Sequence, residues 1–251
     1  MIRKLFLSPS SVFLMIAFSA VFSYDAYAQI PNQLAQDFVA GKAPGSADVA
    51  KYEKEAAEKP DDLRVVRRLG KAYFFQFFGD ADNDAVPKAQ KTLERALVVE
   101  KDDPETLAYL GALHIFAARR LHKQDPAKQK AGYDRGFELV KLAEKLGPRD
   151  GAVISVASGS YIVLPDSYGM APHVIEMLEG MRQGMGPAFK RFAHHGQQRL
   201  LLTLGQAYAR TGQSEKAKAA FDEALAVNTN SVEAGLLRSE LEKLTAGPAK
   251  K

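Results

Sequence analysis

The stretch LLTLGQAYARTGQSEKAKAAFDEA, residues 201–224, decides the fold class of this chain. Each half places apolar or small residues three and four positions apart, which is the period of one face of an α-helix. The first half has Leu201, Leu204, Gly205 and Tyr208, and the second has Ala217, Phe221 and Ala224. The turn sequence Thr211-Gly212-Gln213 separates the halves, so the stretch predicts two helices joined by a tight turn.

Three earlier segments carry the same pattern in the same register. They are Val66, Leu69, Gly70 and Tyr73 with Ala89, Leu93 and Ala96; Leu107, Leu110, Gly111 and His114 with Gly136, Val140 and Ala143; and Ile154, Ala157, Ser158 and Tyr161 with Ala171, Ile175 and Leu178. The pattern resembles the tetratricopeptide repeat, with aliphatic residues where that family usually has Trp. The resemblance implies an all-α fold, a right-handed α-α superhelix of about four helix pairs with loop insertions and capping helices.

The repeats are longer than those of the family they resemble. Successive pairs are 41, 47 and 47 residues apart, counted between Leu69, Leu110, Ala157 and Leu204. The family period is about 34 residues. We expect the additional residues in inserted loops at 79–87, 120–131 and 180–187, where they would be able to form a ligand site.

The beginning of the chain has the pattern of a secretory signal. Arg3 and Lys4 precede an apolar run at 12–22, and Ala26-Tyr27-Ala28 has the small-x-small pattern of a cleavage site. Cleavage is expected after Ala28, without stable membrane insertion afterwards. The expected location is the periplasm.

The remaining boundaries follow from the repeat register and from proline and glycine. We expect a linker at 29–45, a solenoid at 46–245 and a disordered tail at 246–251. Within the solenoid, the predicted repeats are 63–103, 104–150, 151–197 and 198–231, a half repeat precedes them from Ser46, and a capping helix spans 230–245.

Composition excludes several classes of protein. Of 251 residues, 46% are hydrophobic and 25% charged, and there is no Cys and no Trp. A disulfide framework and a cysteine-ligated metal are therefore excluded. The formal net charge of +4 is spread along the chain, so no nucleic-acid partner is expected.

Few residues have the spacing that catalysis or metal binding requires. No two of the five histidines are four residues apart, and adjacent His194 and His195 would point about 100° apart on a helix. Asp80, Asp82 and Asp84 alternate as in a calcium loop, but Ala85 and Lys91 occupy the positions of its turn glycine and bidentate glutamate. We predict no catalytic, cofactor-binding or metal site.

The resemblance also implies where a partner binds, because the first helices of such repeats line a concave groove. The residues expected to line it are Arg64, Arg67, Lys71, Phe74, Ala108, Tyr109, Ala112, Ser155, Leu202 and Gln206. Arg64, Arg67 and Lys71 would make one end basic, which favours a partner segment with an acidic end. Part of the aromatic run at 73–78, above all Phe74 or Phe78, is also a candidate contact.

These observations favour a non-catalytic periplasmic adaptor that binds a protein or peptide partner through this groove. Two alternatives remain open. The inserted loops favour a transport-associated or small-ligand-binding protein, and the loop carboxylates and histidines, such as Asp166 and His173, favour an enzyme subunit. The sequence does not determine the oligomeric state.

Overall fold

The computed structural model describes residues 46–80, 82–121 and 124–245, including their side chains except at 46–48, 78–80 and 232. Helices account for nearly all of this part of the chain, which contains no strand. The elements are α2 (Ser46–Glu58), α3 (Leu63–Asp80), α4 (Ala85–Val99), α5 (Pro104–Arg120), α6 (Pro126–Leu146), α7 (Gly151–Tyr161), η3 (Asp166–Tyr168), α8 (Ala171–Met185), η4 (Gly186–Arg191), α9 (His194–Arg210), α10 (Ser214–Val227) and α11 (Val232–Thr245). The all-α prediction is confirmed.

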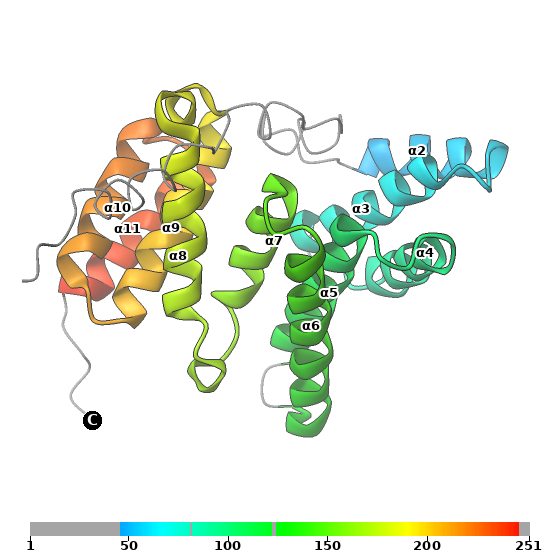
Figure 1. Cartoon of the computed structure of the whole chain (residues 1–251), viewed down its shortest axis with the longest axis horizontal. Coiled ribbons are helices and arrows are strands. Elements are labelled where there is room, and N and C mark those ends of the chain that lie inside the picture. The colour runs from blue at the N-terminus through cyan, green and yellow to red at the C-terminus, as the bar shows by residue number, and fades with distance from the viewer. Residues whose placement is uncertain (1–45, 81, 122–123, 246–251) are drawn as a thin grey trace, which may run out of the picture.

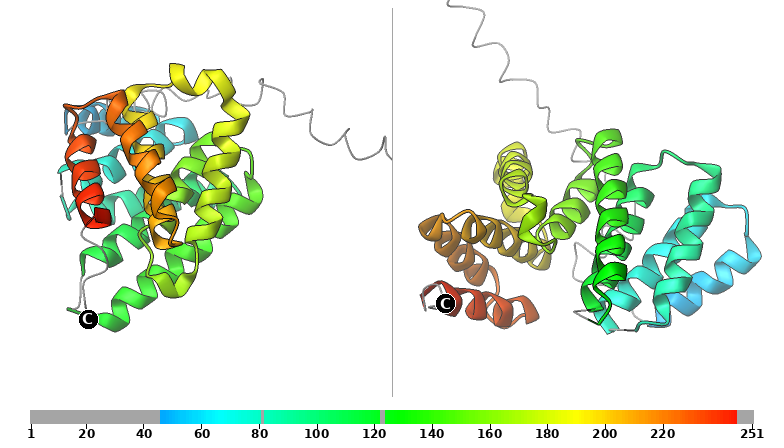
Figure 2. Two further views of the ribbon diagram at one scale, coloured as in Figure 1. Left: turned by 90° about the vertical axis from the view of Figure 1, so that its left-hand side faces the viewer. Right: turned by 90° about the horizontal axis from the view of Figure 1, so that it is seen from below.

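The helices are arranged as consecutive antiparallel pairs, α3–α4, α5–α6, α7–α8 and α9–α10, with α2 before them and α11 after them. Figure 1 shows the N-terminal pairs on one side of the molecule, α8–α11 on the other and α7 between them. The further views in Figure 2 show the pairs following one another along a curved path. The predicted signal, linker and tail lie outside the described residues.

Local sequence explains where the central first helices begin. Asp103 accepts a hydrogen bond from the backbone N–H of Thr106 at 2.9 Å, and Asp150 accepts one from Ala152 at 2.8 Å. Asp125 caps α6 in the same way through Lys128, at 2.9 Å. An aspartate side chain satisfies a backbone donor that has no partner within the helix, so these residues fix three of the helix starts.

The insertions differ from the prediction because they mostly lengthen helices. Of the expected loops at 79–87, 120–131 and 180–187, the first is reduced to four residues between Asp80 and Ala85, and much of the second lies within α6. In the third, α8 continues to Met185 and is followed by the 3-10 helix η4. In the second insertion, Asp125 caps α6 and Pro126 is its first residue, so a helix begins where the loop was expected.

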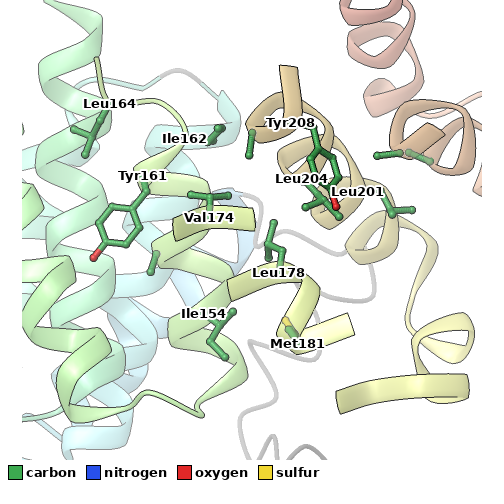
Figure 3. Close-up of a cluster of buried hydrophobic side chains, with 14 of the residues drawn as sticks. Ile154, Tyr161, Ile162, Leu164, Val174, Leu178, Met181, Leu201, Leu204 and Tyr208 are labelled. Carbon is green, nitrogen blue, oxygen red and sulfur yellow. The ribbon is translucent and has the colours of Figure 1, made fainter. Parts of the chain in front are cut away.

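Two clusters of buried side chains form the core. The first extends from α2 to α7, and the second from α5 to α11; Figure 3 shows part of the second, where Ile154, Leu178 and Leu201 lie among their neighbours. Both clusters include residues of α5, α6 and α7. Val153 belongs to the first cluster and Ile154 to the second, so α7 joins the two.

None of the helices in the described residues has the length and apolar character that crossing a membrane requires.

Candidate binding surfaces

The three cations expected at the basic end of the groove all have acidic partners. Arg64, with a side chain 86% exposed, pairs with Asp62 at 3.0 Å. The hydrogen bond from Arg64 lowers the pKa of Asp62. Arg67 contacts both Glu100 and Asp103. The charge of this end is therefore largely neutralised.

Lys71 is inside the protein. Its side chain is 1% exposed and forms an ion pair with Glu105, and its Nζ lies 5.3 Å from the centre of the Tyr109 ring. Burial lowers the pKa of Lys71, while Glu105 opposes that shift. A partner on the protein surface would not reach this ammonium, so the prediction that Lys71 lines an open groove is corrected.

The aromatic and small residues expected in the middle of the groove are core residues too. Phe74, Ala108, Tyr109 and Ala112 are all at most 5% exposed. The rings of Phe74 and Tyr109 meet edge-on, with centroids 5.2 Å apart, because α3 and α5 lie close together. The predicted contacts at these four residues are therefore also corrected; the side chain of Phe78 lies outside the described residues.

Four residues on the first helices of the third and fourth pairs remain accessible, and we call them the α7–α9 surface. They are Ser155, Gly159, Leu202 and Gln206, all partly exposed. A Cβ atom added at Gly159 would have nothing within 4 Å, so the backbone of α7 faces open space there. Three of the ten predicted groove residues thus lie on an open first-helix surface, and Arg64 is exposed at the other end of the chain.

A depression of about 550 Å³ lies on the opposite side of α9, between α8, η4 and α10. It is lined by Glu179, Arg182, Gln183, Gly186, Phe189, Lys190, Gln197, Leu204, Tyr208, Lys216, Ala219, Ala220 and Glu223. The insertion at 180–187 supplies part of its wall. Sequence reasoning indicated an inserted segment here but missed the lining residues on α9 and α10, which have ordinary repeat spacing.

Repeated tyrosines join successive pairs. Tyr73 donates a hydrogen bond to Glu53 at 2.6 Å, Tyr161 donates to Glu144 at 3.1 Å, and Tyr208 donates to Glu179. In each case the carboxylate is on the helix that precedes the tyrosine's own pair. Burial, followed by the bond to Glu179, raises the pKa of Tyr208 to about 12.

The second pair departs from this arrangement in both partners at once. His114 stands at the tyrosine position, and Leu97 stands where the third and fourth pairs have Glu144 and Glu179 on the preceding helix. Burial lowers the pKa of His114, which favours its neutral form in this half-buried setting. The matched positions of the tyrosines and glutamates are visible in the sequence, but the prediction of groove residues did not take them into account.

Three of the residues considered for metal binding or catalysis have structural partners. His173 Nε2 lies 2.6 Å from Glu144, Asp166 lies 3.5 Å from Arg210, and His195 Nδ1 lies 2.8 Å from Glu233. Within the described residues, no three His, Asp or Glu side chains are grouped as metal ligands. His122 and the side chain of Asp80 lie outside the described residues.

A second hollow, of about 450 Å³, lies between the start of α6 and the turn around η3. Its carboxylate is already paired, because Asp134 accepts from Tyr168 at 2.5 Å and from Lys130 at 2.6 Å. Tyr133 packs edge-on against Tyr168 at 6.4 Å. This arrangement fixes the turn to α6.

Comparison with known proteins supports the fold. No protein-family model matches the sequence, and no curated protein matches it. Among solved structures, a thermophilic tetratricopeptide-repeat protein of Thermus thermophilus is similar, with a TM-score of 0.59 and 16% sequence identity over 85% of this chain and 98% of that chain. The chain therefore has the fold of a tetratricopeptide-repeat solenoid, and the predicted superhelix of helix pairs is confirmed.

Proposed function

We propose that this protein is a non-catalytic scaffold that binds a protein partner through the α7–α9 surface. The observation that carries this proposal is the difference between the two halves of the solenoid. Equivalent first-helix positions are buried at Ala108 and Ala112 in the second pair but accessible at Ser155, Gly159, Leu202 and Gln206. Repeat solenoids commonly use such surfaces to bind extended partners.

The composition of the surface fits a segment of polypeptide. Leu202 offers an apolar contact, and Ser155 offers a hydroxyl group. Gln206 offers its amide oxygen, since its amide nitrogen donates to Glu240 at 3.5 Å, and Gly159 permits close approach of a partner's backbone. We further propose that the scaffold acts in the periplasm, which rests on the signal-like sequence at 1–28.

Site-specific photocrosslinking tests the proposed surface. A photoreactive residue at position 155 or 206 is expected to give an adduct of the same mass in cells, because both positions would touch one partner. Positions 91 and 226, exposed on the second helices α4 and α10, serve as matched controls. Equal adducts at the controls, or no adduct at 155 and 206, would contradict the proposal.

The proposed location has a separate test. Sequencing the N-terminus of the mature protein from a fractionated Gram-negative host is expected to find Gln29 in the periplasmic fraction. Recovery of an intact N-terminus in the cytoplasm would show that the signal assignment is wrong.

A further inference from the structure

The depression between α8, η4, α9 and α10 combines an apolar floor with charged walls. Leu204, Tyr208, Phe189 and Ala220 are each at most 6% exposed, and all of them line it. Its volume of about 550 Å³ is within the range of about 300–1,000 Å³ typical of small-ligand sites. The depression is therefore large enough for a ligand with an apolar body.

Both carboxylates in the wall are already engaged. Glu179 accepts the hydrogen bond from Tyr208, and Glu223 accepts two from Arg182, at 2.7 and 2.8 Å. The guanidinium of Arg182 also lies 5.4 Å from the centre of the Phe189 ring. The ion pair between Arg182 and Glu223 bridges α8 and α10. Both carboxylates of the wall thus have a hydrogen-bond donor within the protein.

Two lysines of the wall have no acidic partner in the part of the chain that the structure describes. Lys190 and Lys216 are exposed, and neither lies within 4.0 Å of a carboxylate oxygen. The Nζ of Lys216 lies 5.3 Å from the centre of the Tyr208 ring, so it projects over the floor. The ammonium of Lys216 over an apolar floor, with Lys190 as a second exposed lysine of the wall, matches a ligand that is anionic at one end and apolar at the other.

We propose that this depression binds an organic carboxylate, with its apolar portion on Leu204, Tyr208 and Phe189 and its carboxylate at Lys190 and Lys216. A free carboxylic acid and the C-terminus of an apolar peptide both present this chemistry. The insertion that extends the third repeat contributes Arg182, Gln183 and Gly186, and η4, which follows it, contributes Phe189 and Lys190, which gives that insertion a function.

The site is separate from the α7–α9 surface because the two lie on opposite faces of α9. Leu202 lies two residues before Leu204, and Gln206 lies two residues before Tyr208. Two residues correspond to about 200° of rotation around an α-helix, so each pair points to opposite sides of α9. Substitutions in the depression therefore leave the crosslinking positions intact, and failure of either proposal is distinguishable from failure of the other.

Binding is measured on the mature chain by NMR with two probes, octanoate and an N-acetylated peptide with a C-terminal leucine. Each is compared with its uncharged amide. We expect shifts of the backbone amides of Lys216, Ala219 and Ala220 with the carboxylates, and binding weaker by about tenfold or more with the amides. Binding of octanoate alone assigns a free acid as the ligand, and tighter binding of the peptide assigns a peptide terminus.

Two variants test the residues. Lys190→Gln with Lys216→Gln is expected to weaken binding by about tenfold or more, whereas Lys91→Gln with Lys101→Gln, an equal change of net charge on distant exposed lysines, leaves it unchanged. Ala219→Phe fills the depression at an exposed helix position and is expected to abolish binding. No shift with either probe, amides that bind as well as acids, or equal binding by the double lysine variant would overturn the proposal.

Discussion

Lys71 is a charged residue enclosed by the packing of α3 against α5. Removing an ammonium from water carries a large free-energy cost, which here is offset by the carboxylate of Glu105 and by the face of the Tyr109 ring. The residue lies at the position that faces the groove in the repeat pattern. Its burial therefore makes it part of the joint between the first and second pairs.

This buried pair predicts a non-additive effect on stability. Glu105→Gln is expected to lower the free energy of unfolding by about 3 kcal/mol, because it leaves a buried ammonium without its counter-charge. Lys71→Met combined with Glu105→Leu is expected to recover most of that loss, since burying an apolar pair does not carry the free-energy cost of removing two charges from water. Urea unfolding followed by circular dichroism measures both values.

The control for this prediction is an ion pair on the surface. Lys218 and Asp222 are 2.6 Å apart and about half exposed, so Lys218→Met is expected to change the free energy of unfolding by less than about 0.5 kcal/mol. If Glu105→Gln changed it as little as Lys218→Met, the pair at Lys71 would not be the joint inferred here.

At the scale of helices, close approach within a pair depends on small residues at the crossing. A Cβ atom added at Gly136 of α6 would lie 2.6 Å from the backbone carbonyl oxygen of Gly111 in α5. A backbone atom cannot move aside as a flexible side chain does. The two helices must therefore separate if Gly136 is replaced.

Gly136→Ala is accordingly expected to lower the free energy of unfolding by about 2 kcal/mol, within the range for overpacked sites. Gly180 provides the matched control, because it also lies within a helix but a Cβ atom there would have nothing within 4 Å. Gly180→Ala is expected to raise the free energy of unfolding by about 0.5–1 kcal/mol through the better helix propensity of alanine. Thermal and urea denaturation distinguish the two signs, and stabilisation by Gly136→Ala would show that the crossing is not tight.

The hydrogen bonds from tyrosines to glutamates of the preceding helix show how much a local sequence pattern reveals about contacts between helices. Tyr161 and Tyr208 occupy the same repeat position, and so do their acceptors Glu144 and Glu179. The tyrosine position was evident from the repeat. Its acceptor was not, because a glutamate on the outside of one helix has the same local sequence whether it faces solvent or the next pair.

For the whole molecule, the two core clusters divide stability between the N-terminal and C-terminal pairs. In repeat proteins each unit contacts mainly its neighbours, so a local change spreads through the nearest interfaces first. Val153 and Ile154 are adjacent on α7 but pack into different clusters. This pair of residues allows each half to be perturbed separately.

Hydrogen exchange followed by mass spectrometry tests this division. Ile154→Ala is expected to speed exchange first in α8 and α9 and then in α10, and Val153→Ala first in α5 and then in α3 and α4, because α7 contacts α5, α8 and α9 directly. A loss of about 2 kcal/mol or more is expected for the isoleucine. Unsubstituted protein provides the reference rates. Equal acceleration along the whole chain by both variants would show a single cooperative core instead.

The sequence by itself determined the helix pairs, their number and their register. Those features depend on periodicity and turn residues within about 40 consecutive positions, such as Leu204, Gly205 and Phe221. These local patterns are the same however the helices pack against one another. Only the tertiary structure decided which first-helix residues are open. Lys71 is covered because α5 brings Glu105 and Tyr109 against it, and Lys190 and Lys216 line one depression because α8, η4 and α10 meet beside α9. Burial and charge pairing depend on contacts between residues far apart in the chain, and the spacing of residues within one helix does not determine those contacts.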